Sequence, residues 1–395
     1  MPSLMRLAAL SAVSVLALGA AGALAEEFHG FDPASHDASM ISADQLAAMI
    51  EEAKGVTPPR NGESYVIGFA NLQRDISFCI KVEEGLVANA EAAGVELAIT
   101  DNRLDGATAL ANAESYVSRD VDYVIEFQTD ANFGATIMQR MDEAGISVTA
   151  IDIPMPGSTF FGANNPRSGY MGGAYLAQAA IAEFGAEAAA SGYFVVGELP
   201  QSGPIPAMRT GGQVAGFKAV LPDFPDDNLI FIDTKNTLQE SFAQMNNVIG
   251  RIPDDAVIMI TAINDQAATG MLRAVQQADR EAQTLVVGMG ADELDTMMSE
   301  PRFIASVGYF PERYGNYLLP MALMELAGKE LPPAVLMNHV MISPSNVCEY
   351  YDTQECAEDA VAFDASFPED AFKDHVAALR EDPELAGNED LIPSN

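Results

Sequence analysis

The sequence reads YVIGFA at residues 65–70, VELAIT at 95–100, YVIEF at 123–127 and ISVTAID at 146–152. Each stretch is short and rich in β-branched, aromatic and other apolar residues, which indicates a buried strand. The segments between them carry apolar residues at helical spacing, as at Val82, Leu86 and Ala90. Strands that alternate with helices in this way predict a parallel sheet with helices on both faces.

The same alternation returns in the second half of the chain. Further strands are expected near residues 193–198, 228–234, 256–261, 284–290 and 304–310. Together these strands are too many for one comfortable open sheet, and 395 residues exceed the usual size of a single domain. The sequence therefore predicts an α/β protein made of two doubly wound parallel-sheet lobes.

The N-terminal 25 residues have the pattern of a cleavable export signal. Arg6 precedes the apolar run 7–18, and the segment Ala23-Leu24-Ala25 has the small residues that signal peptidase accepts. The run is shorter than the roughly 20 residues that a membrane-spanning helix needs. We therefore expect residues 1–25 to be a signal peptide cleaved after Ala25, which places the mature protein in the periplasm.

The composition is strongly acidic, with 57 acidic residues against 20 basic ones and a net charge of −37. Such a surface repels nucleic acid and anionic lipid, so no nucleic-acid partner is expected. The 49% of hydrophobic residues is still enough for a large core, which argues against disorder. We interpret the acidity as solvation of the surface and infer no cationic ligand from it.

The few cysteines and histidines indicate a disulfide and no metal site. Cys348 and Cys356 lie close together in a polar segment, and an oxidising compartment favours a disulfide between them that leaves Cys79 unpaired. None of the four histidines has the spacing of a zinc site. A phosphate-binding loop and a dinucleotide-binding glycine motif are absent from the sequence as well, so no cofactor is expected.

Candidate binding residues follow the predicted strands, because ligands of parallel sheets bind where strand carboxyl ends and helix N-termini converge. These candidates are Asp75, Phe78, Gln128, Asp152, Arg209, Asn264 and Asp292. An aromatic ring can stack on the apolar face of a sugar, and carboxylate, amide and guanidinium groups can bond its hydroxyls. Structural roles stay open beside this reading: Asp75 and Asn264 as helix caps, Phe78 as a core residue and Asp152 as a solvated strand end.

Two longer motifs carry a family resemblance. FFGANNPRSGYMGG at residues 160–173 and TAINDQAATG at 261–270 resemble stretches of the type I periplasmic binding proteins of the ribose and galactose kind. Those proteins feed ABC importers and are related to the effector domain of LacI-like regulators. The similarity runs from about Tyr65 to Ile342. It implies two lobes joined by three crossovers, with the ligand bound between them and closing the hinge.

The resemblance also assigns roles to particular residues. Phe78 matches the first-loop aromatic, Asp152 the acid that ends the fourth strand, and Asn264 the asparagine of the Asn-Asp pair. Tyr309 falls near the hinge position where a glutamine is common.

Two positions depart from the family pattern. The family arginine position holds Gly211, with Arg209 two residues earlier. The aspartate that usually follows Val-Val-Gly is replaced by Gly290, with Asp292 two residues later. Both departures point away from a standard ribose or galactose ligand.

The crossovers implied by the resemblance, near 155–162, 309–311 and 339–346, divide the chain. The divisions are a signal peptide at 1–25, a leader at 26–62 with one helix near 42–54, a first lobe at 63–156 plus 311–338, a second lobe at 157–310 plus 339–347, and an acidic C-terminal extension at 348–395.

The resemblance implies a periplasmic solute-binding protein of an ABC transporter. We expect a monomer that binds a sugar or polyol, docks on an ABC permease in the inner membrane and catalyses nothing. One alternative is a ligand sensor that docks on a membrane receptor. Another is a secreted glycoside hydrolase, because paired carboxylates could lie anywhere among the acidic residues, although no Gly-x-Ser-x-Gly motif is present. A transcription regulator is excluded because residues 1–60 hold no basic helix-turn-helix.

Overall fold

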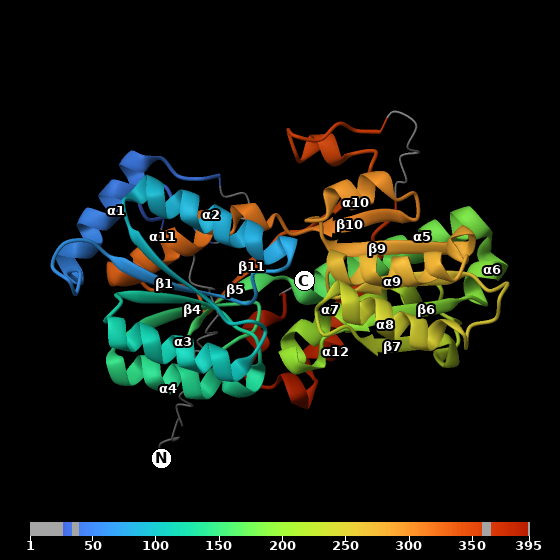
Figure 1. Cartoon of the computed structure of the whole chain (residues 1–395), viewed down its shortest axis with the longest axis horizontal. Helices are drawn as coiled ribbons and strands as arrows, with labels where there is room; N and C mark the ends of the chain where they lie inside the picture. Colours follow the sequence, from blue (N-terminus) through green and yellow to red (C-terminus); the bar gives the residue numbers. More distant parts are fainter. Residues whose placement is uncertain (1–26, 34–38, 358–364, 394–395) are drawn as a thin grey trace, which may run out of the picture.

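The computed structural model describes residues 27–33, 39–357 and 365–393 and contains two α/β lobes that lie side by side (Figure 1). Each lobe is built on one six-stranded sheet. The prediction of two doubly wound lobes is therefore confirmed. The predicted signal peptide and its cleavage site after Ala25 lie outside the described residues.

The first lobe carries the sheet β11-β5-β4-β3-β1-β2, in which every pairing is parallel. Its strands are β1 (Val66–Asn71), β2 (Glu96–Asp101), β3 (Tyr123–Phe127), β4 (Ser147–Ile151), β5 (Thr159–Ala163) and β11 (Ala334–Met337). Its helices are α1 (Ala43–Val56), α2 (Ser77–Ala93), α3 (Gly106–Arg119), α4 (Gly134–Ala144) and α11 (Gly315–Leu326). Helices α1, α2 and α11 cover one face and α3 and α4 the other (Figure 1). Strand β3 is buried along its whole length, as expected between two helical layers.

The second lobe carries the sheet β12-β10-β9-β8-β6-β7, in which only β12 is antiparallel to its neighbour. Its strands are β6 (Tyr193–Glu198), β7 (Leu229–Asp233), β8 (Ile258–Ala262), β9 (Thr284–Gly290), β10 (Phe303–Gly308) and β12 (Val340–Ile342). Its helices are α5 (Asn165–Phe184), α6 (Ala186–Ala190), α7 (Pro204–Val220), α8 (Leu238–Ile249), α9 (Asp265–Gln277) and α10 (Leu294–Ser299).

Short 3₁₀ helices complete the two lobes and the C-terminal region. They are Ala131–Phe133, Pro200–Ser202, Asp226–Asn228, Glu281–Gln283, Pro311–Arg313, Val347–Glu349, Pro383–Leu385 and Glu389–Leu391.

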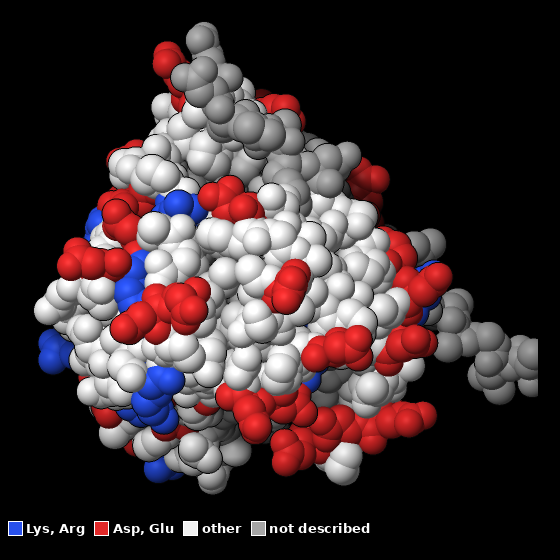
Figure 2. Space-filling view, turned by 90° about the vertical axis from the view of Figure 1, so that its right-hand side faces the viewer, with Lys and Arg blue, Asp and Glu red and all other residues white. Residues whose placement is uncertain are grey.

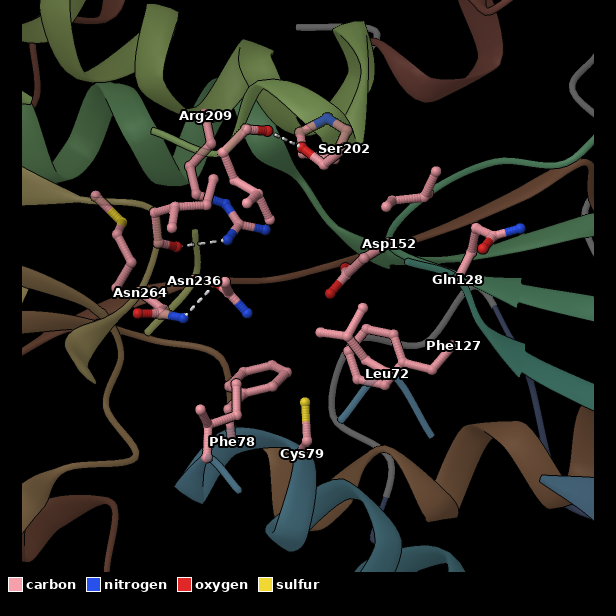
Figure 3. Close-up of a pocket in the computed structure, with 16 residues that line it drawn as sticks. Leu72, Phe78, Cys79, Phe127, Gln128, Asp152, Ser202, Arg209, Asn236 and Asn264 are labelled. Carbon is pink, nitrogen blue, oxygen red and sulfur yellow. Dashed lines mark hydrogen bonds between the residues drawn. The ribbon is translucent and has the colours of Figure 1, made fainter. Parts of the chain in front are cut away.

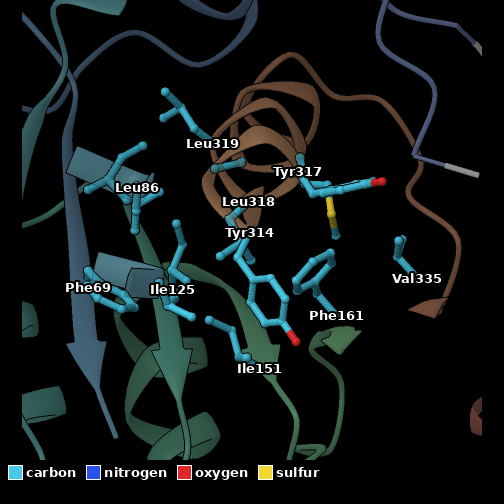
Figure 4. Close-up of a cluster of buried hydrophobic side chains, with 14 of the residues drawn as sticks. Phe69, Leu86, Ile125, Ile151, Phe161, Tyr314, Tyr317, Leu318, Leu319 and Val335 are labelled. Carbon is cyan, nitrogen blue, oxygen red and sulfur yellow. The ribbon is translucent and has the colours of Figure 1, made fainter. Parts of the chain in front are cut away.

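An aromatic cluster anchors the chain where it returns to the first lobe (Figure 4). The rings of Tyr314 and Tyr317 lie 4.9 and 5.4 Å from the ring of Phe161 on β5. Ile125 and Ile151 of the neighbouring strands belong to the same buried cluster. Burial of apolar surface stabilises the fold by about 25 cal/mol for each Å² removed from water, which amounts to several kcal/mol for one aromatic ring. The cluster therefore fixes α11 against a sheet formed by a distant part of the sequence.

Three crossovers join the lobes, and one imidazole connects them. The chain passes between lobes after β5, after β10 and between β11 and β12. His339, in the third crossover, accepts a hydrogen bond from the backbone N–H of Asn164 in the first, at 3.0 Å. Its other ring nitrogen lies 3.1 Å from the carbonyl oxygen of Gly308 in the second. The three segments are thus held together at one point.

The first crossover lies later in the chain than the resemblance implied. Strand β5, at residues 159–163, was assigned to the second lobe at 157–310, but it pairs with β4 and β11 of the first sheet. The turn through Pro154 and Gly157 leads the chain back into the same sheet, because Phe161 extends the apolar core of the first lobe. The boundary between the lobes therefore follows Ala163.

The leader belongs to the first lobe. Helix α1 starts after Ser42, whose side chain and that of Gln45 form a capping box, close to the predicted start. Leu46 and Met49 are fully buried in the same cluster as α11. The leader thus adds a helical layer to this lobe.

The C-terminal extension contacts both lobes. The disulfide Cys348–Cys356, expected from the sequence, is present in its first part. Its helix α12 (Glu369–Arg380) buries Phe372 and Val376 against α5 and α7, beside α7 in Figure 1. Farther on, Leu391 belongs to the same apolar cluster as Phe160 of the first lobe. The extension therefore spans the junction of the lobes.

The surface of the second lobe carries scattered charge (Figure 2). Acidic side chains predominate over basic ones on this face, gather mainly toward its edges and also stand near its centre. They are most crowded along its lower edge and sparser elsewhere.

Replacing Phe372 tests how firmly the extension is attached. Phe372→Ala removes a ring that is 1% exposed, so we expect a loss of about 3–5 kcal/mol in the free energy of unfolding. Urea denaturation of the mature protein measures it. The adjacent exposed Lys373→Ala is the control, with an expected change within about 0.5 kcal/mol. Equal effects of the two substitutions would show that α12 does not pack on the lobes.

Candidate functional site

A pocket with about 550 Å³ of empty space, open solvent included, lies where the carboxyl ends of the strands of the two lobes face each other (Figure 3). It is lined by Leu72, Ile76, Phe78, Cys79, Phe127, Gln128, Asp152, Ile153, Leu199, Ser202, Pro206, Arg209, Asn236, Ile263, Asn264 and Met289. Five candidates named from the sequence are among them: Phe78, Gln128, Asp152, Arg209 and Asn264.

Asp152 supplies the carboxylate of the first lobe. It follows β4 with a left-handed φ of 59°, which turns the side chain toward the cavity (Figure 3). One carboxylate oxygen accepts a hydrogen bond from the N–H of Ala163 at 3.1 Å. Burial raises the pKa of Asp152, and the positive charge of Arg209 opposes this shift. No ion pair joins Asp152 to Arg209, so the two groups face each other across a gap.

Arg209 supplies the cation of the second lobe and is held rigidly. Its Nε donates to Asn165 at 3.0 Å and its Nη1 to the carbonyl oxygen of Ile263 at 2.7 Å. Its guanidinium lies 4.9 Å from the ring centroid of Tyr309, in cation–π geometry. Its helix α7 packs backbone to backbone on α5, since a Cβ at Gly169 would collide with the carbonyl oxygen of Arg209.

Asn264 has a structural role at the cavity. Its Oδ1 accepts from the N–H of Ala267 at 2.8 Å, so it caps α9, the alternative that the sequence left open. Its amide nitrogen donates to Oδ1 of Asn236 at 2.7 Å. Asn236 in turn donates to Gln73 of the first lobe at 3.1 Å, which connects the two walls of the cavity.

Asn236 and Gln73 were missed by the sequence analysis. Asn236 follows β7, and Gln73 follows β1 within a loop from which only Asp75 and Phe78 were selected. The rule that polar residues after strands face the ligand would have found both. It was not applied to the segment after β7.

Three candidates do not line the cavity. Asp75 is exposed and accepts a hydrogen bond from Gln73, because the loop turns its side chain outward. Tyr309 lies beneath Arg209 and donates its hydroxyl to Ser168 at 2.8 Å. Asp292 is 5% exposed, and one of its carboxylate oxygens has no partner. Its pKa is raised well above the usual range by burial and by the charge of Asp265.

Gln128 lines the cavity but turns its amide into its own loop. Its Oε1 accepts from the N–H of Thr129 at 2.6 Å, and its Nε2 lies 3.3 Å from the sulfur of Met155. Figure 3 shows the side chain at the edge of the cavity. Its amide is therefore not directed at a ligand.

The lobes are in a closed arrangement. Besides the Asn236–Gln73 bond, Ser77 and Lys81 of α2 donate to the carbonyl oxygen of Asp292 in the second lobe, at 3.0 and 2.7 Å. Such cross-lobe bonds require the lobes to be in contact. Separation of the lobes therefore requires these bonds to break.

The described part of the chain shows neither a metal cluster nor a membrane span. Among the described residues, no group of three or more His, Cys, Asp or Glu side chains is arranged to hold a metal ion. In the same ranges, no helix combines the length and the apolar character that crossing a bilayer requires.

The architecture defines a class: two-lobed α/β proteins with a ligand cavity between lobes joined by three crossovers. Residues 67–330 match the family model described as periplasmic binding protein domain. The chain belongs to this family.

Sequence relatives include the ribose import binding proteins RbsB of Salmonella typhimurium and Escherichia coli K12. Each is 23% identical over 258 residues, which cover 64% of this chain and 82% of the relative.

Two similar solved structures show the same fold. One is an ABC transporter periplasmic solute binding protein from Actinobacillus succinogenes with bound D-allose, at a TM-score of 0.60 and 18% identity, covering 73% of this chain and 100% of that one. The other is an ABC transporter solute binding protein from Mycobacterium smegmatis with bound glycerol, at a TM-score of 0.61 and 17% identity, covering 76% of this chain and 100% of that one.

Glu126 is a buried carboxyl behind the cavity that the sequence analysis did not single out. It precedes the cavity residue Phe127 on β3 and is fully buried. Asn102 donates to one carboxylate oxygen at 2.8 Å, and the other has no partner. Burial raises the pKa of Glu126 to about 8, and the bond from Asn102 opposes this rise.

Because the buried Glu126 carboxyl resists ionisation, we expect it to lower the free energy of unfolding as the pH rises. Its pKa is higher in the folded state, so between about pH 4.5 and 8 the unfolded chain loses this proton first. We expect Glu126→Gln, which stays neutral, to match the wild type at pH 4.5 and to exceed it by about 3–5 kcal/mol at pH 9. Urea unfolding at pH 4.5, 7 and 9 measures this. The exposed Glu96→Gln should show no such trend, and a pH-independent difference for Glu126→Gln would contradict the assignment.

Proposed function

We propose that the protein is the periplasmic solute-binding component of an ABC importer and carries a sugar or polyol between its two lobes. The single observation behind this is the pair Asp152 and Arg209, which line the same cavity from opposite lobes with no ion pair between them. A desolvated carboxylate and guanidinium left apart are costly unless a solute bonds both. Hydroxyl groups of a solute can donate hydrogen bonds to the Asp152 carboxylate and accept them from the Arg209 guanidinium.

The relatives support this choice of solute class. The curated relatives are ribose import binding proteins, and similar solved structures hold D-allose and glycerol. Bonds between the lobes exist only when the cleft is shut, so a solute that contacts both walls stabilises the closed state. An inner-membrane permease would then receive the closed, loaded monomer.

The lining of the cavity argues against catalysis. Glycoside hydrolysis needs two carboxyl groups around the scissile bond, and Asp152 is the only one among the described lining residues. Burial raises the pKa of the Cys79 thiol well above its ordinary value, which disfavours a thiolate nucleophile. The Ser202 hydroxyl donates to the carbonyl oxygen of Leu199 at 2.7 Å and has no histidine beside it in the lining.

Binding to the mature protein is the direct test. Thermal-shift and calorimetric titration against sugars and polyols should find a solute that stabilises the protein by about 2.7 kcal/mol at 100 times its dissociation constant. The solute should be recovered chemically unchanged. Absence of binding across the whole panel, or conversion of the solute, would refute the proposal.

Asp152 should carry a large share of the affinity. The isosteric Asp152→Asn replaces a charge-assisted bond with a neutral one, so we expect affinity for the solute to fall by about 1–3 kcal/mol, or roughly 5- to 150-fold. Calorimetry measures the change. The exposed Asp142→Asn on α4 is the matched control and should bind like the wild type. Unchanged affinity in Asp152→Asn would remove this residue from the site.

A further inference from the structure

Residues 365–393 of the C-terminal extension, which we call the strap, are fastened to the second lobe. Tyr170 of α5 donates its hydroxyl to the carbonyl oxygen of Pro368 at 3.0 Å. The side-chain amide of Gln178, also on α5, donates to the carbonyl oxygen of Ser366 at 2.8 Å and accepts from its backbone N–H at 3.0 Å. Phe372 of α12 is buried against α5 and α7. The strap therefore moves with the second lobe.

The end of the strap lies on the first lobe. Leu391 and Ile392 are 6% and 2% exposed and share an apolar cluster with Phe160 of β5. Leu336 of β11 packs against the same cluster, and the short helix Glu389–Leu391 lies beside this strand. Apolar side chains of the strap are thus buried on both lobes.

The end of the strap is tied to its helix. Arg380, the last residue of α12, donates from Nη2 to the carbonyl oxygens of Ile392 and Pro393, at 2.7 and 3.0 Å. Leu385, between the helix and this end, is buried in the same apolar cluster. The strap therefore acts as one body that is anchored on the second lobe and rests on the first.

Rotation of the lobes disturbs this contact. Phe160 lies four residues before Asn164, which bonds His339 at the junction of the crossovers. Four residues of strand span about 13 Å, so each rotation of about 10° displaces Phe160 by about 2 Å relative to the strap. Apolar side chains lose contact beyond about 4.5 Å between heavy atoms, and close-packed side chains cannot overlap. The packing of Leu391 therefore fits the closed arrangement and is disrupted by a rotation of about 20° in either direction.

We propose that the strap holds the two lobes closed in the absence of a solute, and that the lobes part only when Leu391 and Ile392 leave the first lobe. The strap lies outside residues 67–330, which match the family model, so it is built from residues beyond the matched domain. The inference concerns the lobes alone and goes beyond the proposed function, whatever solute the cavity takes.

Pulsed electron paramagnetic resonance on the ligand-free mature protein measures the separation of the lobes. Spin labels on Ser115→Cys in α3 and Ala243→Cys in α8 occupy exposed positions on the two lobes, and the buried Cys79 stays unlabelled. We expect one predominant short distance when the strap is unchanged. Leu391→Asp puts a charge into the apolar cluster, so the ratio of open to closed molecules should rise at least about tenfold.

A matched pair on α12 tests the same point without a change in the cluster. Arg380→Met removes the bonds that tie the end of the strap to α12, so the ratio of open to closed molecules should rise at least about threefold. Lys373→Met makes the same chemical change at an exposed position of this helix, where the side chain pairs with Asp370 at 3.4 Å. This control should keep the distance distribution of the unchanged strap.

The outcomes decide the inference without a solute. A larger open fraction in Leu391→Asp than in Lys373→Met supports it. Equal distributions in these two variants overturn it, provided that urea unfolding shows Leu391→Asp to be folded. If Leu391→Asp does not fold, the comparison of Arg380→Met with Lys373→Met decides in the same way. The proposed function is judged separately by the binding panel.

Discussion

His339 joins the three chain segments that connect the lobes, and the geometry of the cavity depends on this junction. Its ring bonds Asn164 and lies against Gly308, while its ring centroid is 4.4 Å from that of Tyr309. Tyr309 in turn lies under the guanidinium of Arg209. A continuous set of contacts therefore leads from the hinge to the cation of the cavity. Because packed aromatic contacts resist small distortions, the position of Arg209 is coupled to how the crossovers are arranged.

The two walls of the cavity differ in the groups that they contribute. The first lobe contributes a carboxylate at the end of β4, and the second contributes donors at the start of α7 and α9. Neither wall carries both charges, since Asp152 comes from the first lobe and Arg209 from the second. The cavity combines a carboxylate, a guanidinium and amide groups in an apolar surrounding, where each bond is stronger than in water and each unpaired group costlier. The extension adds to this closed form, since its apolar cluster takes residues from both lobes.

Much of the fold could be predicted from sequence because it is encoded locally. The apolar runs at 123–127 and 284–290 coincide with β3 and β9, and Ser42 begins α1 by capping. Asp152 and Arg209 were found because polar residues after parallel strands converge on one edge. Asp75 and Asp292 followed the same rule and yet lie outside the cavity, as does Tyr309, which the family resemblance placed near the hinge. The direction of a loop side chain depends on the residues that surround it in the folded protein, and local sequence patterns do not reveal those neighbours.

By itself, the sequence determined the alternation of strands and helices, the division into two lobes, the acidic surface and the polar edge of each sheet. These features follow from the composition of the chain and from periodic patterns that extend over a few residues. Only the tertiary structure decided that β5 stays in the first sheet, that Asn236 meets Gln73 across the cleft, and that Asp152 and Arg209 line the same cavity. Those outcomes depend on contacts between segments far apart in the chain, and such contacts are set by packing, with each side chain taking the partner that the folded backbone brings within reach.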